Sequence, residues 1–109
     1  MDCVFCKIIN KEIPSEIVYE DDNFVAFKDV NPKAPVHFLL VPKKHILSID
    51  HVEIKDKDLM GELILITQKI AREKKLEGYK LVINVGRVGG QIIDHLHLHI
   101  LSGKPTELP

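Results

Sequence analysis

Three features that mark common protein classes are missing from this chain. Its only cysteines, Cys3 and Cys6, are too few and too close together for the disulfide framework of a small secreted protein. No apolar run approaches the roughly 20 residues needed to cross a bilayer, and the start at Met1 lacks the charged and apolar regions of a signal peptide. The formal net charge is −1, which leaves no broad basic surface for nucleic acid. We therefore expect a cytoplasmic protein that binds neither nucleic acid nor membranes.

Length and residue pattern indicate one small domain. The 109 residues, 45% of them hydrophobic, suffice for a single core, and no repeat or linker divides them. Alternating apolar residues bounded by turns predict strands near 17–20, 24–29, 37–42, 79–85 and 95–101. Helical spacing predicts a short helix near 4–10 and a long amphipathic helix from Lys55 to about Lys75. We expect an α+β domain over residues 1–109, with the long helix on one face of the sheet and residues 102–109 as a tail.

The strand predicted at 95–101 carries a row of histidines. His95, His97 and His99 alternate with aliphatic residues. Because successive side chains on a strand point to opposite faces, the imidazoles would line one surface and the aliphatic residues would be buried on the other. Neighbouring imidazoles would lie roughly 6.5 to 7 Å apart, so one phosphate group could touch two of them. A helix would scatter both sets of side chains.

Three interpretations of this histidine row are open. The row could be a solvated strand face, or a metal site, because imidazole is the commonest metal-ligand side chain. Alternatively, a neutral imidazole could attack phosphorus while its neighbours position oxygens and move protons. The segment 84–91 favours this third interpretation, because its glycines allow backbone amides to approach an anion closely. Taken alone, that loop matches neither the Rossmann nor the P-loop spacing.

With these residues the chain resembles the histidine triad superfamily, whose signature is three histidines separated by single aliphatic residues. The segment from Phe27 to His45 is similar to the part of Hint-type members that supplies the nucleoside pocket and a fourth histidine, here His37. The similarity runs from about Cys3 to Leu101. It implies the histidine triad fold, a five-stranded antiparallel sheet with one long amphipathic helix and a short N-terminal helix.

The resemblance also implies a reaction. His97 would attack the α-phosphorus of a purine nucleoside 5′-phosphoramidate, form a covalent nucleotidyl-histidine and release AMP or GMP on hydrolysis. That role requires a neutral ring with one nitrogen held as a donor, in the family by a backbone carbonyl on the same strand. His99 would bond a phosphate oxygen, and His37 would complete the catalytic cluster. No cofactor is required for this phosphoryl chemistry.

The other expected nucleotide contacts follow from the same resemblance. Asp29 would accept from the ribose hydroxyls, and Phe27 and Val30 would cover the base. Asn84 would touch the nucleotide, while Gly90, Gln91 and Ile92 would lie along the phosphate. Several of these residues also have ordinary structural interpretations, since Asp29 suits a turn, Phe27 and His37 suit a core, and Asn84 suits a loop cap.

Two positions depart from the family pattern. Ile92 stands where Hint-type members usually place Ser or Thr, whose hydroxyl bonds the leaving group. Without that hydroxyl we expect chemistry slower by about ten- to a thousandfold. Asp94 stands where an aromatic residue is frequent. It could stabilise an imidazolium, support a metal ligand from outside, or be an exposed acid.

The Cys-x-x-Cys pair could be half a zinc site, a redox couple or two small buried residues. Redox use of the thioredoxin type is disfavoured, because no predicted strand precedes the pair. In bacterial-type members of the superfamily and in related galactose-1-phosphate uridylyltransferases, two histidines complete such a pair. This implies a structural zinc held by Cys3, Cys6, His45 and His95. His95 would then be a ligand or scaffold, not a proton donor.

The resemblance further implies a homodimer formed through the long helix and the strand that follows it. Two classes of function stay open at this point. One is a purine nucleoside phosphoramidase, with a diadenosine-polyphosphate hydrolase as a near variant and a metal-dependent hydrolase as a more distant one. The other is a nucleotide-binding or protein-interaction module in which Ile92 has weakened catalysis.

Overall fold

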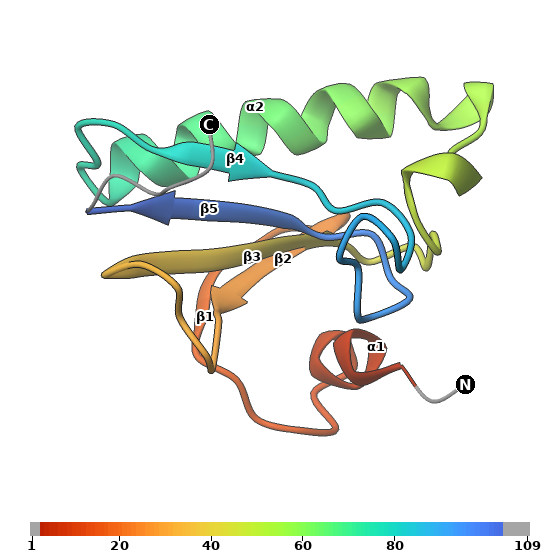
Figure 1. Ribbon diagram of the computed structural model, residues 1–109, viewed down its shortest axis with the longest axis horizontal. Helices are drawn as coiled ribbons and strands as arrows, with labels where there is room; N and C mark the ends of the chain where they lie inside the picture. Colours follow the sequence, from red (N-terminus) through yellow and green to blue (C-terminus); the bar gives the residue numbers. More distant parts are fainter. Residues whose placement is uncertain (1–2, 104–109) are drawn as a thin grey trace.

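The computed structural model describes residues 3–103. In chain order its elements are α1 (Val4–Ile9), β1 (Ile17–Glu20), β2 (Phe24–Lys28), β3 (Val36–Pro42), two 3-10 turns (Ile49–His51 and Ile54–Asp56), α2 (Lys57–Glu73), β4 (Lys80–Val82) and β5 (Leu98–Ser102). The strands form one antiparallel sheet in the order β1-β2-β3-β5-β4 (Figure 1). The predicted α+β class and five-stranded antiparallel sheet are therefore confirmed.

The long helix α2 packs on one face of this sheet. Its apolar stripe buries Leu63, Ile66 and Ile70 against alternate residues of the central strands, among them Leu98 and Ile100 of β5. Burial of each such side chain contributes about 1.5–3 kcal/mol, which is the main reason the helix docks. Nothing in residues 3–103 forms a helix long and apolar enough to cross a membrane.

The short helix α1 covers part of the opposite face. Phe5 and Ile8 of α1 pack against Val25 and Phe27 of β2 and against Leu39 of β3. The Cys3 thiol caps this helix by accepting from the Cys6 N–H at 3.3 Å. The two predicted layers are thus joined by a partial third layer, with α1 and α2 on opposite sides of the sheet (Figure 1).

The boundaries of the last strands differ from the sequence expectation. β4 is shorter than 79–85, because the chain enters the glycine-rich loop soon after Val82. β5 begins at Leu98, where its pairing with β3 starts, so His99 alone of the three histidines lies within it. The Leu96 N–H donates to the Ile46 carbonyl outside the sheet. Ser102, expected to open the tail, ends β5 instead, and residues 104–109 of that predicted tail lie outside the described residues.

Alternation survives in the extended lead-in to β5. Leu98 and Ile100 are buried against α2, whereas the rings of His97 and His99 pack edge-on against each other on the other face, with centroids 5.0 Å apart. His95 lies on this face as well, since its ring and the His97 ring both contact Phe5 of α1. The period of two therefore predicted the faces correctly, although the regular strand starts later than expected.

Candidate active site and metal centre

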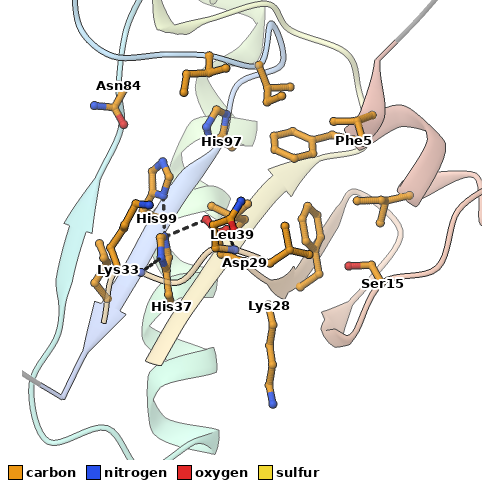
Figure 2. Close-up of a pocket in the computed structure, with 18 of the residues that line it drawn as sticks. Phe5, Ser15, Lys28, Asp29, Lys33, His37, Leu39, Asn84, His97 and His99 are labelled. Atoms are coloured by element: carbon orange, nitrogen blue, oxygen red, sulfur yellow. Dashed lines mark hydrogen bonds and ion pairs between the residues drawn. The ribbon is translucent and has the colours of Figure 1, made fainter. Parts of the chain in front are cut away.

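A cavity of about 640 Å³ opens on the α1 side of the sheet, between α1, the turn after β2 and the loop that leads into β5. The triad residues His97 and His99 line it together with His37 of β3. So do all the predicted nucleotide contacts except Gln91, namely Phe27, Asp29, Val30, Asn84, Gly90 and Ile92. Figure 2 shows the histidines and Asn84 at one end of this cavity and Ser15 at the other. The cavity is therefore long, with its three histidines gathered at one end.

His97 lies at the polar end of the cavity with one ring nitrogen fixed. Its Nδ1 lies 2.7 Å from the backbone oxygen of His95. A carbonyl only accepts, so Nδ1 donates and the lone pair of the neutral ring is on Nε2. Burial lowers the pKa of His97, an effect opposed by the carbonyl bond and by the charge of Asp29. The expected orientation of His97 by a backbone carbonyl is present, and it leaves on Nε2 the lone pair that a nucleophilic imidazole requires.

Beside His97, three further side chains and one backbone amide form a connected group. Nε2 of His37 lies 2.9 Å from Nδ1 of His99 and 3.4 Å from Oδ2 of Asp29. The Lys33 N–H donates to the other nitrogen of His37, Nδ1, at 3.0 Å. Dashed lines in Figure 2 trace these contacts. Burial, together with the neighbouring His97 and His37, lowers the pKa of His99 to about 4, and burial also lowers the pKa of His37.

The glycine-rich loop differs from the anion-binding nest that its sequence predicts. The amides of Gly89, Gly90 and Gln91 donate to carbonyls within the loop, at Gly86 and Arg87. The loop needs glycine for a different reason: a Cβ on Gly89 would lie 2.3 Å from the Val85 carbonyl oxygen, and Gly90 has a φ of +93°.

Gln91 is a correction to the predicted contacts. Its side chain is buried, 2% exposed, and does not line the cavity. The amide group donates to the carbonyls of Leu47 and Ile93 and accepts from the Gly86 N–H at 2.9 Å. These bonds anchor the glycine loop to the segment after β3, so the side chain supports the loop from behind.

Asn84 and Asp94 show how the loop is braced. Asn84 donates to the Gly89 carbonyl at 2.8 Å and so braces the loop, and it also lines the cavity, where the predicted nucleotide contact would be made. Asp94 pairs with Arg87 at 2.9 Å on the surface, and Arg87 also donates to the Gln91 carbonyl. Of the three interpretations of Asp94, the exposed acid is the correct one. Ile92 projects from this loop, 79% exposed, at the rim of the cavity.

The apolar end of the cavity includes a residue that the sequence reasoning missed. The Phe5 ring packs edge-on against Phe27, with centroids 5.4 Å apart, and against His97 at 5.0 Å. Phe27 is 3% exposed and so serves both the core and the cavity wall, whereas Val30 is 88% exposed. Phe5 lies between two cysteines in sequence, and only the folding of α1 onto β2 brings its ring to the cavity.

A second cluster lies on the far side of Phe5. The ligand atoms of Cys3, Cys6, His45 and His95 all lie within 4.8 Å of one another. Nδ1 of His95 is 3.4 Å from the Cys3 sulfur and 3.6 Å from the Cys6 sulfur, and Nδ1 of His45 is 3.3 Å from the Cys6 sulfur. In tetrahedral zinc sites the corresponding ligand separations are about 3.5 Å. The four residues predicted as ligands are therefore brought together in a geometry that fits a metal.

The hydrogen bonding of His95 provides a second test of fit. Its Nε2 lies 2.8 Å from the Pro42 carbonyl oxygen and must donate to it. The lone pair is then on Nδ1, which faces the two sulfurs. Ligating histidines typically donate their other N–H to such a backbone acceptor, which fixes the ring. Two thiols and two imidazoles form a donor set typical of structural zinc.

Comparisons with known proteins agree with this geometry. Residues 2–107 match the family described as "Scavenger mRNA decapping enzyme C-term binding". Protein HitA of Neisseria gonorrhoeae is 48% identical over 102 residues, which are 93% of this chain and 95% of HitA. The crystal structure of a HIT family hydrolase from Legionella pneumophila Philadelphia 1 superposes with a TM-score of 0.95 at 44% identity, covering 99% of this chain and 98% of that one.

A histidine triad protein from Clostridium difficile gives a TM-score of 0.93 at 49% identity, covering 97% and 94% of the two chains. These matches extend over nearly the whole length of both partners, and they agree with the arrangement of His95, His97 and His99. They support a hydrolase of the nucleotide-binding kind. The chain belongs to the histidine triad superfamily.

Proposed function

We propose that the protein is a purine nucleoside 5′-phosphoramidate hydrolase that works through a covalent nucleotidyl-histidine at His97. The observation that carries this proposal is the His97 ring, whose Nδ1 is occupied by the His95 carbonyl while Nε2 is left with a lone pair beside the cavity. A neutral imidazole with one nitrogen tied down is a nucleophile that is already oriented. Its lowered pKa keeps the ring neutral at pH 7.

In the proposed first step, Nε2 of His97 attacks the α-phosphorus. The new nitrogen–phosphorus bond forms as the bond to the amine breaks, and the amine leaves with a proton taken from solvent. In the second step water attacks phosphorus and gives up a proton to solvent, the bond to His97 breaks, and the nucleoside monophosphate is released with the His97 ring neutral again. His99 donates a hydrogen bond to the phosphate oxygen on which charge develops.

The shape of the cavity supports a nucleotide as substrate. Asp29 lies between the histidines and Ser15 (Figure 2), and we propose that its carboxylate accepts hydrogen bonds from the ribose hydroxyls. The rings of Phe5 and Phe27 contact each other and line the apolar part of the cavity, and we propose that a purine packs beside them. The volume of about 640 Å³ lies within the range of small-molecule sites.

We propose that the second cluster holds a structural zinc ion. Cys3, Cys6, His45 and His95 would be the ligands, and the ion would tie the start of α1 to the segments after β3 and before β5. Bound there, zinc supplies rigidity and no reacting group. No step of the proposed reaction passes through it.

We also propose that the protein works as a homodimer. β4 is an edge strand, and apolar side chains are exposed near it: Leu65 of α2 is 65% exposed, Ile64 is 50% exposed, and Leu81 of β4 is 39% exposed. A second copy would cover this surface. Light scattering of the wild type and of Leu65→Glu tests the proposal, which predicts twice the monomer mass for the first and a lower mass for the second.

The test of the proposed reaction is intact-mass analysis during turnover of an adenosine phosphoramidate. The reaction is quenched without acid, because phosphorus–nitrogen bonds break in acid. We expect an adenylyl adduct on the wild type and none on His97→Gly, with AMP as the product.

One observation favours a second candidate function. Ile92 is exposed at the cavity rim where a hydroxyl would assist the leaving group, so the chain could bind nucleotides with little catalysis. The same experiment separates the two functions. AMP binding by calorimetry without adduct or turnover would establish the binding module and reject the hydrolase.

A further inference from the structure

The position of the proton on the His37 ring is set by a backbone group. The Lys33 N–H donates to Nδ1 of this ring at 3.0 Å. A ring nitrogen that accepts a hydrogen bond carries no proton, so the one proton of the neutral His37 ring must be on Nε2. The side chain is 5% exposed, which leaves little access for water to compete with the amide. A backbone amide cannot change its role from donor to acceptor, and the tautomer of His37 is therefore fixed by the peptide chain.

The position of the proton on the His99 ring follows from that of His37. The Nε2–H of His37 faces Nδ1 of His99 across 2.9 Å, and two N–H groups cannot face each other at that distance. Nδ1 of His99 must therefore accept, and the proton of His99 must be on its other nitrogen. Asp29 offers a second acceptor to the same N–H, but it is more distant, at 3.4 Å.

We propose that the Lys33 amide, acting through His37, holds His99 as the Nε2–H tautomer, so that His99 presents a hydrogen-bond donor to an anionic oxygen in the cavity. The identity of that anion as a phosphate rests on the proposed function. His37 is then a positioning residue and not, as the family resemblance implied, a catalytic one. The turn that contains Lys33 sets the direction of every hydrogen bond in the group.

Both rings must be neutral for this relay to exist, and their surroundings favour that state. Burial is the largest cause that lowers the pKa of each of these two histidines, and for His99 the value falls to about 4. At neutral pH each ring thus has one proton and one lone pair, and the geometry decides which nitrogen has which.

The relay explains why two adjacent histidines of the triad have different chemical roles. His97 donates from Nδ1 to a carbonyl, so its Nε2 is a lone pair. His99 accepts at Nδ1 from an imidazole, so its Nε2 is an N–H. The rings lie 5.0 Å apart and would present a nucleophile and a donor to the same group. Opposite partners at Nδ1 are what distinguish them.

The direct test is the tautomer of His99, measured by ¹⁵N–¹H correlation spectroscopy of the histidine rings in the purified wild-type protein with its natural metal content at pH 7.5. His99→Gln identifies the signal. We expect a proton on Nε2 alone. A proton on Nδ1, or an even mixture of tautomers, would overturn the proposal without any variant of His37. This measurement needs no substrate, so it fails or succeeds independently of the proposed reaction.

Two substitutions of His37 then separate the two bonds of the relay. Asn places its amide oxygen where Nδ1 was, so His37→Asn keeps the bond from Lys33 and loses the donor to His99. Gln reaches the position of Nε2, so His37→Gln keeps a donor to His99 and loses the acceptor for Lys33. Each variant removes one hydrogen bond from the same buried position, and thermal melting checks that both remain folded.

We expect His37→Asn to release His99 into a mixture of tautomers and to lower kcat about tenfold or more with little change in KM. We expect His37→Gln to keep the Nε2–H tautomer and to lose less of kcat than His37→Asn does. An unchanged His99 tautomer in His37→Asn would show that the relay does not operate. If only one variant folds, its predicted tautomer decides the question alone.

Discussion

Two clusters of side chains of the kinds that can bind metals lie on the same side of the sheet. They differ in whether the histidine that is hydrogen-bonded to a backbone group turns a lone pair or an N–H toward the rest of its cluster. The possible ligand atoms of Asp29, His37 and His99 lie within 4.8 Å of one another. The same is true of the sulfurs and ring nitrogens of the cysteine cluster, which consists of Cys3, Cys6, His45 and His95. In the cysteine cluster, His95 donates outward to the Pro42 carbonyl and turns a lone pair inward.

In the cavity cluster the outer partner is a donor, the Lys33 amide, and His37 turns a proton inward. A cation needs lone pairs, so the cysteine cluster is suited to holding a metal and the cavity cluster to passing hydrogen bonds from one ring to the next. Residue type and distance alone do not separate the two clusters. The backbone group behind each imidazole does.

The largest effect on activity is expected from substitution of His97, which lines the cavity and belongs to neither cluster. His97→Gln should reduce kcat/KM for an adenosine phosphoramidate by at least about 10⁴-fold, because the nucleophile is removed. Its metal content, measured by inductively coupled plasma mass spectrometry, should equal that of the wild type. Activity within tenfold of the wild type would exclude His97 as the nucleophile.

Substitution of Cys6 should have the opposite result, a loss of metal and stability, because Cys6 belongs to the cysteine cluster and does not line the cavity. Cys6→Ser should lose bound metal and lower the melting temperature, since a structural metal contributes directly to folding. Removing the metal from the wild type with a chelator should have the same effect on melting.

Metal stoichiometry tests the cavity cluster in the same samples. The wild type should hold one equivalent of zinc, and Asp29→Asn should still hold one, as should the matched control Asp94→Asn at a surface carboxylate. A second tightly bound equivalent that disappears in Asp29→Asn would contradict the distinction between the clusters.

A smaller effect is expected at the rim of the cavity. Ile92→Ser supplies the hydroxyl that Hint-type members carry, and should raise kcat by about tenfold or more. Ile92→Val removes one methylene from the exposed side chain without adding a hydroxyl and should leave kcat within about twofold. Equal rates in both variants would mean that the leaving group does not use this position.

The smallest effect expected is on stability at mildly acid pH. Because the pKa of His99 is about 4 in the folded protein and that of a free histidine is about 6.5, the unfolded chain binds more protons between these values. The free energy of unfolding should therefore fall as the pH falls through this window, by at most about 1.4 kcal/mol per pH unit for this ring. Urea denaturation of the wild type should show this slope, and it should be reduced in His99→Gln at equal metal content.

The sequence predicted the faces of the sheet better than the contacts made by its loops. Period-two alternation from His95 to Ile100 was sufficient to place imidazoles opposite aliphatic residues, because pleating alone decides the face. The stripe at Leu63, Ile66 and Ile70 predicted the packing of α2 for a similar reason. The four proposed metal ligands were identified through the family resemblance, since they come from three separate segments of the chain.

What the sequence could not predict depends on backbone groups. The Lys33 amide that fixes His37 has no signature, because every residue except proline has such an amide. The glycine loop was expected to offer its amides to an anion, but tight turns use them internally. Gln91 was predicted to lie along the phosphate, because nothing in the sequence indicated that its side chain would be buried and hydrogen-bonded behind the loop.

His95 joins the two clusters within one residue. Its imidazole faces the sulfurs, while its carbonyl oxygen accepts from the ring that would attack phosphorus. The start of α1 and the reacting nitrogen are consequently separated by one side chain, one peptide group and one hydrogen bond. We therefore expect a substitution of Cys3 that loosens the N-terminal segment to change the orientation of the His97 ring, although the Cys3 side chain itself does not line the cavity.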